Sequence, residues 1–526
     1  MSFAFPSTHA ASDPDRPAVV VGGTDATLTY GQLEARSNRV AHVLRARGLG
    51  VGDHVAMLLE NRTEFFEVMW AGLRSGVYVT PINWHLNPSE VAYIVEDCEA
   101  KLLFGSADLL ARLGQEITMP DDRRIAVGGA VDGLPGYEDV LAEQPATPID
   151  DECAGTYMFY SSGTTGRPKG IKPPNIGGEL GQPDNFTMLM QGLYGFDERS
   201  VYLSPSPLYH AAPAGWTTGA HRLGSTTVVM ERFDPVQTLE LIERHRVTHV
   251  QFVPTHMVRL LKLPEEERNR FDLSSLQYVI HAAAPCPPDV KRAFIEWVGP
   301  IVHEYYSGSE GAGFCVIGPE EWLAHPGSVG TSVMGAVHVV GPDGTEVGPR
   351  QEGQIFFEAP HRFEYHKDPE KTASAYDEHG WSTLGDIGWV DEEGYLYLTD
   401  RVSNMIISGG VNIYPREVED VLVVHPDIAD VAVIGVPHPD MGEAVRAIVE
   451  PTGPVDDEEA FAAALVDFCR ERLTHYKCPT SVALVETLPR LPTGKIAKRV
   501  FDPWLREAYE DGALVHSSLP DAASGS

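Results

Sequence analysis

The sequence has 526 residues, 43% of them apolar, which is enough for two to four domains with substantial cores. Its 75 acidic residues outnumber its 40 basic ones, and the formal net charge of −35 disfavours nucleic acid and anionic membranes as partners. No run of 18 apolar residues predicts a membrane-spanning helix, and the N-terminus lacks the pattern of a secretory signal.

The first 320 residues alternate helix-like and strand-like segments. Residues 29–50 combine helical apolar spacing with an N-terminal threonine and a closing glycine, and β-rich runs at 17–23 and 54–60 flank them. The same alternation recurs at 63–83, 88–105, 234–254 and 287–306. This pattern predicts an α/β architecture with largely parallel sheets covered by helices.

The later part of the chain has a different residue pattern. Residues 327–360 are rich in turns and short strands, which predicts a β subdomain at about 325–400. Helical patterns at 414–425 and 456–476 then alternate with strand-like runs at 428–437 and 443–451. We predict four parts: a large N-terminal domain at 1–400, a hinge at 401–404, a small mobile α+β domain at 405–515 and a disordered tail at 516–526.

The six cysteines are scattered along the chain, without a C-x-x-C pair. Such spacing is typical of reduced thiols rather than of a disulfide framework or a zinc site. We therefore expect a cytoplasmic protein.

Residues 160–170 form a glycine-rich string, YSSGTTGRPKG, that follows the segment 154–160, which we expect to be one buried strand. Glycines allow backbone N–H groups to converge, while hydroxyls and Lys169 add donors and positive charge. The Walker pattern is absent, because Lys169 is followed by Gly170. The ordered spacing nevertheless favours a loop that binds a di- or triphosphate over a flexible surface turn.

The loop resembles the signature of the adenylate-forming superfamily, which includes acyl-CoA synthetases, luciferases and nonribosomal adenylation domains. Six later segments resemble further motifs of that superfamily in the same order, at 203–215, 282–285, 305–311, 381–401, 407–419 and 488–499. The resemblance covers nearly the whole chain and is closest to fatty-acyl and aryl acid–CoA ligases. It implies that a carboxylic acid is joined to AMP with release of pyrophosphate and then passed to coenzyme A.

The resemblance also implies roles for individual residues. The ATP phosphates would be held by Ser161, Ser162, Gly163, Thr164, Thr165, Gly166 and Lys169, and Thr164 and Glu310 would face Mg²⁺. Adenosine and coenzyme A would be contacted by residues from the later motifs, namely Ala283, Ala284, Tyr305, Tyr306, Asp386, Arg401, Ser408, Gly409 and Gly410. Ser309 would contact the phosphate or Mg²⁺ region, and Lys495 would bind at the α-phosphate.

Four of these residues carry the most specific expectations. Tyr306 would stack on adenine, Asp386 would accept both ribose hydroxyls, and Arg401 would reach the ribose or a phosphate. Lys495 would bridge the acyl carboxylate and the α-phosphate during adenylation. In the family the domain that carries this lysine then rotates away and presents a glycine loop, here Ser408–Gly410, to the thiol.

Two positions depart from the common family pattern. The hinge would fall at Ser403, where many relatives have Asp or Lys, and Leu384 stands where Thr is frequent. His210 would lie at the mouth of the acyl pocket, as a catalytic residue or as a packing histidine.

The acid and its acceptor are less well defined. The segment 211–220 holds no Asp or Glu to pair with an ammonium group, which favours a fatty, alicyclic or aryl acid over an amino acid. Coenzyme A is the preferred acceptor. Two alternatives stay open, an enzyme that loads carrier-protein phosphopantetheine and a non-catalytic nucleotide-binding relative. The oligomeric state is also open, with a homodimer among the options.

Overall fold

The computed structural model describes residues 5–114, 116–161, 168–174, 176–359, 362–401, 404–409, 411–438, 440–489, 501 and 515–517. The chain divides into two compact units. The first comprises Met1–His281, Ser309–Gly311 and His361–Ser374, and the second Ala282–Gly308, Ala312–Pro360 and Ala375–Ser526. The domain boundary at residue 400 and the hinge at 401–404 stay predictions.

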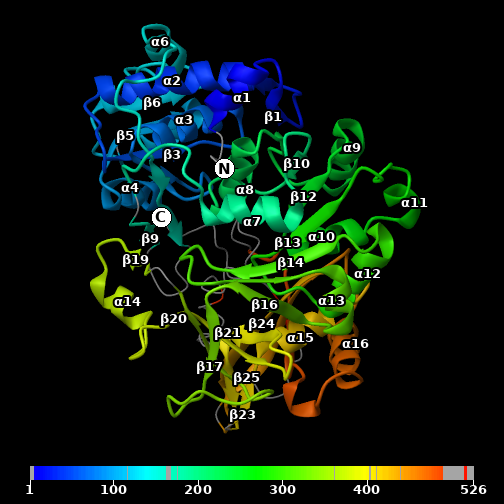
Figure 1. Ribbon diagram of the computed structural model, residues 1–526. Helices are drawn as coiled ribbons and strands as arrows, with labels where there is room; N and C mark the ends of the chain where they lie inside the picture. Colours follow the sequence, from blue (N-terminus) through cyan, green and yellow to red (C-terminus); the bar gives the residue numbers. More distant parts are fainter. Residues whose placement is uncertain are drawn as a thin grey trace. The chain divides into compact units, whose positions relative to one another are not determined.

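One sheet of the first unit is wholly parallel. Its strand order is β6 (Arg124–Val127), β5 (Ala100–Ser106), β3 (His54–Leu58), β4 (Tyr78–Pro81) and β7 (Thr156–Tyr157). Its associated helices are α2 (Tyr30–Ala46), α3 (Thr63–Arg74), α4 (Pro88–Asp97), α5 (Ala107–Leu113) and α6 (Tyr137–Ala142), and Figure 1 shows α2 and α3 together beside β3, β5 and β6. This arrangement confirms the predicted α/β alternation.

The start of α2 follows from its sequence. The Thr29 hydroxyl accepts the N–H of Gln32 at 3.2 Å, and the Gln32 amide oxygen accepts the N–H of Thr29 at 2.9 Å. This capping box satisfies two N–H groups that the first turn leaves without partners. The helix predicted within 29–50 is therefore confirmed, and it ends at Ala46.

A second sheet segment in the first unit carries the later α/β repeats. Its order is β2 (Thr27–Thr29), β1 (Pro17–Val21), β11 (Thr226–Val229), β10 (Val201–Ser204), β12 (His249–Phe252) and β13 (Tyr278–His281). All neighbours are parallel except β1 and β2. The helices of this region are α7 (Asn185–Tyr194), α8 (Ala211–Arg222), α9 (Pro235–His245), α10 (Pro254–Leu261) and α11 (Glu265–Arg268).

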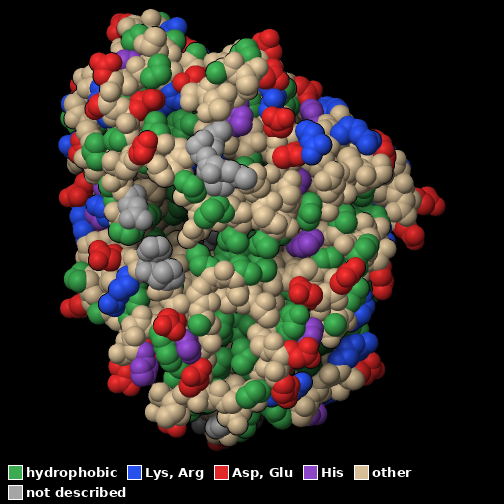
Figure 2. All heavy atoms as spheres, in the orientation of Figure 1, with side chains coloured by type: hydrophobic (Ala, Val, Ile, Leu, Met, Phe, Trp, Pro, Cys, Tyr) green, Lys and Arg blue, Asp and Glu red, His purple; other side chains and the backbone are tan. Residues whose placement is uncertain are grey.

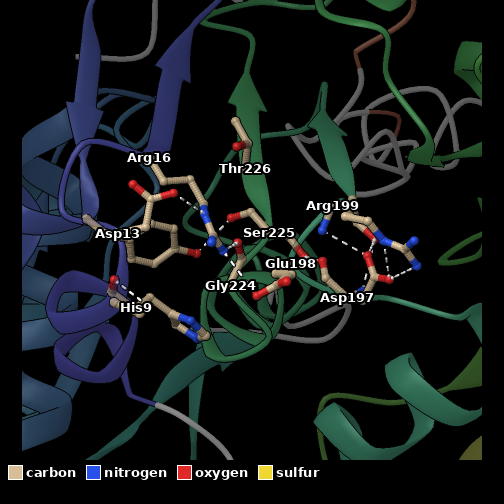
Figure 3. Close-up of polar contacts among 12 residues, drawn as sticks. His9, Asp13, Arg16, Asp197, Glu198, Arg199, Gly224, Ser225 and Thr226 are labelled. Carbon is tan, nitrogen blue, oxygen red and sulfur yellow. Dashed lines mark hydrogen bonds and ion pairs between the residues drawn. The ribbon is translucent and has the colours of Figure 1, made fainter.

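Helix α1 (Pro6–Ser12) is tied to the turn that follows α8, as Figure 3 shows. The His9 ring lies 3.0 Å from the carbonyl oxygen of Arg222. Arg16 donates to the carbonyl of Gly224 and to the Asp13 carboxylate, each at 3.2 Å. These contacts satisfy backbone carbonyls around the turn, so we assign them a structural role.

The segment 154–160 is not the single buried strand that its sequence predicts. It splits into β7, in the parallel sheet, and β8 (Phe159–Ser161), which pairs antiparallel with β9 (Lys169–Lys172). Met158 between them is fully buried, whereas Tyr157 and Phe159 are half-buried. The chain therefore changes sheets at Met158, and the glycine-rich string connects β8 to β9.

The second unit begins with an antiparallel sheet that contains the predicted β subdomain. Its order is β14 (Val302–Ser307), β15 (Phe314–Ile317), β16 (Ser328–Met334), β21 (Leu396–Arg401), β20 (Ser382–Val390), β18 (Gly353–Glu358) and β17 (Ala336–Val340). Helices α12 (Pro288–Val298) and α13 (Pro319–Ala324) accompany it.

The C-terminal part of this unit is a mixed α+β layer. Its sheet runs β23 (Val411–Ile413), β22 (Ile406–Ser408), β25 (Gly442–Pro451), β26 (Ser481–Leu484) and β27 (Val515–Ser517), and β24 (Ile428–His438) also pairs with β25. Helices α15 (Pro415–Leu422) and α16 (Glu458–Arg470) pack with it around a core that includes Val418, Val433 and Leu465.

No helix in the described part of the chain is both long and apolar enough to cross a membrane. Asp and Glu side chains are spread over the face drawn in Figure 2 rather than gathered at one place, in keeping with the net charge of −35. The acidity is therefore a general property of this face.

Candidate active site

The glycine-rich string is the connection of a β-hairpin. Ser161 pairs with Lys169, and Tyr160 pairs with Gly170. Five residues predicted to contact phosphate lie between these strands and outside the described residues: Ser162, Gly163, Thr164, Thr165 and Gly166. Their roles stay predictions.

Lys169 begins β9 and forms an ion pair that the sequence does not predict. Its ammonium nitrogen lies 2.5 Å from Oδ2 of Asp368, and both side chains are about one-third exposed, at 34% and 30%. Oδ1 of Asp368 accepts the N–H of Lys371 at 2.9 Å. Hydrogen bonding by Lys169 and by this N–H lowers the pKa of Asp368, so the carboxylate is ionised at neutral pH.

Glu310 has one carboxylate oxygen engaged. The Tyr365 hydroxyl donates to Oε1 at 3.0 Å, whereas Oε2 accepts no hydrogen bond from any residue that the structure describes. The side chain is half-buried, and the preceding Ser309 is exposed. Lys169, Asp368, Glu310 and Tyr365 all belong to the first unit.

The oxygen ligands around Glu310 suit a magnesium ion that keeps water and phosphate ligands better than a metal bound by protein side chains alone. Among the described residues, no three His, Cys, Asp or Glu side chains gather into a metal site. Magnesium is usually bound through one or two carboxylates, with water and substrate phosphates as the remaining ligands. Glu310, with Oε2 available, fits that chemistry, and Thr164 would be the second protein ligand.

Three residues predicted to contact the nucleoside come together in the second unit. Oδ2 of Asp386 accepts the Tyr306 hydroxyl at 2.6 Å, and Oδ1 accepts Nε–H of Arg401 at 3.1 Å. Asp386 and Arg401 are directly paired across β20 and β21. The sheet register therefore places both side chains at one point.

The Asp386 carboxylate keeps the capacity to accept further hydrogen bonds. Asp386 is only 8% exposed, and an ionised carboxylate offers about four lone-pair sites, of which the described residues occupy two. Burial raises the pKa of Tyr306 well above its usual range, and the neighbouring Asp386 acts in the same direction. Tyr306 therefore remains a hydrogen-bond donor at neutral pH.

Two other predicted positions have unusual local geometry. Ala283 has φ of +74°, a region that residues with a Cβ rarely adopt. Such strain persists where the surrounding structure imposes it, often at functional sites. Ala284 follows it, and the buried Tyr305 stacks on Phe314 with ring centroids 4.9 Å apart.

His210 and Trp216 differ in how they are placed around α8. His210 occupies the position just before the helix, and its ring lies edge-on to Tyr209 at 4.4 Å. Trp216 is fully buried in an aromatic cluster with Phe186 and Tyr194, at centroid distances of 5.2 Å and 5.5 Å. Trp216 thus belongs to the core, while the role of His210 stays a prediction.

The glycine loop predicted to face coenzyme A is a hairpin between β22 and β23. Gly409 has φ of +57°, and its N–H donates to the carbonyl of Met441 at 2.8 Å. This positive φ favours glycine, whereas the methyl carbon of Met441, 2.4 Å from where a Cβ would lie, ends a flexible exposed side chain that could move aside. Ser408 precedes it, whereas Gly410, Ser403 and Lys495 lie outside the described residues.

Comparison with known families decides the classification. Residues 7–364 match the model of the AMP-binding enzyme family, and residues 417–495 match that of the AMP-binding enzyme C-terminal domain. The chain belongs to the AMP-binding enzyme family. This membership confirms the resemblance to adenylate-forming enzymes.

Curated members of the AMP-binding family match along nearly their whole length. The chain is 33% identical over 510 residues to the long-chain-fatty-acid–CoA ligase FadD13 of Mycobacterium tuberculosis, with 95% of this chain and 97% of that protein covered. It is 34% identical over 504 residues to feruloyl-CoA synthase of an Amycolatopsis species, with coverage of 94% and 97%.

Solved structures of AMP-binding enzymes share the fold. The ATP-bound MatB of Rhodopseudomonas palustris is 28% identical, with a TM-score of 0.78 and coverage of 96% of this chain and 99% of that one. The o-succinylbenzoate coenzyme A synthetase of Bacillus subtilis, in complex with ATP and magnesium, is 27% identical, with a TM-score of 0.76 and coverage of 94% and 98%. These similarities confirm the predicted fold class.

Sequence reasoning missed two residues of this AMP-binding enzyme, Tyr365 and Asp368. The local signal for α14 (Pro369–Ser374) was present, because an Asp followed by Pro is typical of a helix start. Nothing local connects Asp368 with Lys169, which lies 199 positions earlier. Only the folded chain brings them together.

Proposed function

We propose that the protein is an ATP-dependent acid–CoA ligase that forms AMP. The observation that carries this proposal is Asp386, a buried carboxylate that meets Tyr306 and Arg401 and retains capacity to accept the ribose hydroxyls. Two curated relatives that match along nearly the whole chain, FadD13 and feruloyl-CoA synthase, are named for making acyl-CoA. A cytoplasmic location belongs to the same proposal.

In the first step, an oxygen of the acid forms a bond to the α-phosphorus of ATP, and the bond from that phosphorus to pyrophosphate breaks. The reactants are anions, so neutralisation of charge is the largest contribution that side chains can make. Lys169 would hold a phosphate oxygen, and Lys495 would meet the acyl carboxylate and the α-phosphate. Magnesium, held by Glu310 and Thr164, would supply further positive charge to the phosphates.

In the second step, the thiol sulfur of coenzyme A bonds to the acyl carbonyl carbon. The bond from that carbon to the AMP oxygen breaks, and the thiol proton passes to solvent. The hairpin at Gly409 would lie along the pantetheine arm, because glycine allows close approach of the backbone.

We assign the substrate to the fatty, alicyclic or aryl acids. The segment 211–220 lacks an acidic side chain, so it offers no partner for the ammonium group of an amino acid. The relatives named above act on a long-chain fatty acid and on ferulate, one from each end of this range.

A carrier protein is the second candidate acceptor. One relative, 31% identical over 517 residues, is the fatty acid–[acyl-carrier-protein] ligase ScoC of Streptomyces coeruleorubidus. Pyrophosphate release with acid and ATP, followed by thioester on a carrier protein and none on coenzyme A, would establish this alternative.

The direct test is a pyrophosphate-release screen over fatty, alicyclic and aryl acids, followed by detection of the acyl-CoA. We expect release to require both ATP and one acid class, and thioester to require coenzyme A. ATP binding without pyrophosphate release for any acid would instead support a non-catalytic relative.

A variant separates the two steps. Lys495→Ala is expected to lower adenylation by about 100-fold or more, since a cation is lost where charge develops. It should still convert a supplied acyl-adenylate to the thioester. Lys498→Ala, in the same segment, is the matched control and should retain both steps. Equal loss of both steps in Lys495→Ala would contradict the assigned role.

A further inference from the structure

A short segment far from the glycine-rich string in sequence is built onto the strand that begins with Lys169. Its strand β19 (Glu364–Tyr365) pairs antiparallel with β9, with Tyr365 opposite Ile171. The N–H of His366 donates to the carbonyl of Gly170 at 2.7 Å. The backbone around Tyr365 is therefore fixed relative to the end of the string.

The side chain of Tyr365 is held as firmly as its backbone. The backbone N–H of Tyr365 donates to the Thr372 hydroxyl at 3.0 Å, which ties β19 to helix α14, and the side chain has contacts of its own. Its ring lies edge-on to Phe363, with centroids 5.5 Å apart. These contacts leave the hydroxyl a defined direction, and it donates to Oε1 of Glu310 at 3.0 Å.

Glu310 needs such a partner. The terminal torsion of a glutamate side chain is broad and roughly two-fold, so an unrestrained carboxylate samples many orientations. Glu310 is half-buried in the turn Ser309–Gly311, which packs with the first unit together with His361–Ser374. The Tyr365 hydroxyl fixes one carboxylate oxygen and leaves Oε2 for another ligand.

We propose that Tyr365 is a positioning residue for Glu310 that sets this carboxylate to receive the magnesium ion accompanying ATP. The inference rests on the proposed function, because it concerns the nucleotide of the same reaction. Outer-shell partners of metal-binding groups typically contribute about 10- to 100-fold to metal affinity or activity. If the Tyr365 side chain only filled space, removing its hydroxyl would not change how strongly magnesium increases ATP affinity.

The test is Tyr365→Phe, which removes the hydroxyl and retains the ring that packs on Phe363. ATP binding is measured by calorimetry with and without magnesium, in the absence of an acid, so that no turnover occurs. We expect the gain in ATP affinity that magnesium gives to fall about tenfold or more. Affinity for ATP alone should match the wild type.

Tyr137→Phe is the matched control. The Tyr137 hydroxyl donates to Oε2 of Glu67 at 2.7 Å, so it makes the same kind of bond within the first unit, between side chains that have no role in the proposed reaction. This control should lower the melting temperature and leave magnesium-dependent ATP binding unchanged. In a Glu310→Gln background, Tyr365→Phe should have no further effect on that binding.

Three results would overturn the inference. The first is an unchanged magnesium effect in Tyr365→Phe. The second is an equal loss of ATP affinity with and without magnesium, which marks a purely structural role. The third is a full effect of Tyr365→Phe in the Glu310→Gln background. Each of these results would leave the proposed function intact, because the wild type would still bind ATP and release pyrophosphate. A wild type that does neither would refute the proposed function, and this inference with it.

Discussion

The two units each contain a close lysine–carboxylate pair, and the two pairs differ in burial rather than in length. In the second unit, Lys291 lies 2.7 Å from Glu304, with side chains 0% and 8% exposed. In the first, Lys169 lies 2.5 Å from Asp368, and both side chains are about one-third exposed. The distance therefore does not distinguish a structural pair from a functional one.

Burial decides what each pair does. A buried pair is costly to break, because the partner left behind is an uncompensated charge away from water. An exposed pair is worth about 0.2 to 1 kcal/mol, so a competing ligand can replace one partner. The Lys291 ammonium also lies 4.8 Å from the centre of the Trp322 ring, which adds to its fixation. We infer that Lys291 stabilises the fold, while Lys169 is exchangeable.

The largest expected effect is on stability, through Lys291→Met. The change removes the ammonium partner of the buried Glu304 carboxylate, and we expect the free energy of unfolding to fall by about 3 to 5 kcal/mol. Urea unfolding followed by circular dichroism measures it. The double variant Lys291→Met/Glu304→Leu should recover most of the loss, because apolar replacements remove both charges. A loss below about 1 kcal/mol would show that burial does not separate the two pairs.

A third pair, between Arg401 and Asp386, is intermediate, with side chains 39% and 11% exposed. Here we expect a change in binding rather than in folding. Asp386→Asn removes the charge that would accept the ribose hydroxyls, and a hydrogen bond to a charged group is worth about 1.5 to 3 kcal/mol. The KM for ATP should therefore rise about 10- to 100-fold.

A comparison of ATP with 2′-deoxy-ATP provides the control for this variant. Wild-type enzyme should discriminate against 2′-deoxy-ATP, and Asp386→Asn should lose most of that discrimination in kcat/KM. If the variant kept the wild-type preference for the ribose hydroxyl, the assignment of Asp386 would be wrong.

A buried histidine that forms no ion pair with a described carboxylate is the limiting case of the comparison. His54 in the first unit is 4% exposed and stacks on Tyr78 with centroids 4.7 Å apart. Burial lowers the pKa of His54 to about 4, and the Lys172 ammonium and a protonated His366 act in the same direction. The nearby Glu99 and Asp53 oppose this shift without cancelling it.

The sign of the pH dependence follows. Between pH 6.5 and about 4 the unfolded state binds a proton at His54 that the folded state does not, so stability falls as pH falls. His54→Phe retains the stacking and removes the titration. Between pH 7 and pH 5 we expect the wild type to lose about 1 kcal/mol more than the variant, allowing for solvent screening. Parallel denaturation curves at the two pH values would refute this expectation.

The sequence predicts one half of the candidate site better than the other, for a physical reason. Asp386 and Arg401 occupy facing positions on adjacent strands, so the register that forms the sheet also brings them together. The contacts of Lys169 and Glu310 come instead from residues 362–374, and no local pattern specifies which distant segment will pair with β9.

The fold shows the same division. Helices such as α2 were predictable because their caps and apolar spacing are local. The division of residues 154–160 between two sheets was not predictable, because the same β-rich composition suits one strand or two. Which partner each half finds depends on β4 and β9, which lie on either side in sequence.

The smallest expected effect sharpens the comparison most directly, because it tests whether the exposed pair is exchangeable. Asp368→Asn retains an amide oxygen that can cap α14, but it removes the anion beside Lys169. ATP then no longer competes with a carboxylate for this lysine. We expect its affinity to increase about 1.5- to 5-fold.

Calorimetry measures this change, with Asp343→Asn as the control. Asp343 is also exposed and accepts an N–H, from Thr345 at 3.0 Å, but it has no ion-pair partner among the described residues. Its replacement should leave ATP affinity unchanged. If Asp368→Asn weakened ATP binding, the carboxylate would be a fixed support for Lys169 rather than a partner that phosphate displaces. The two pairs would then differ in burial but not in exchangeability. Higher salt should reduce the wild-type–variant difference, since exposed charges are screened over about 8 Å at physiological ionic strength.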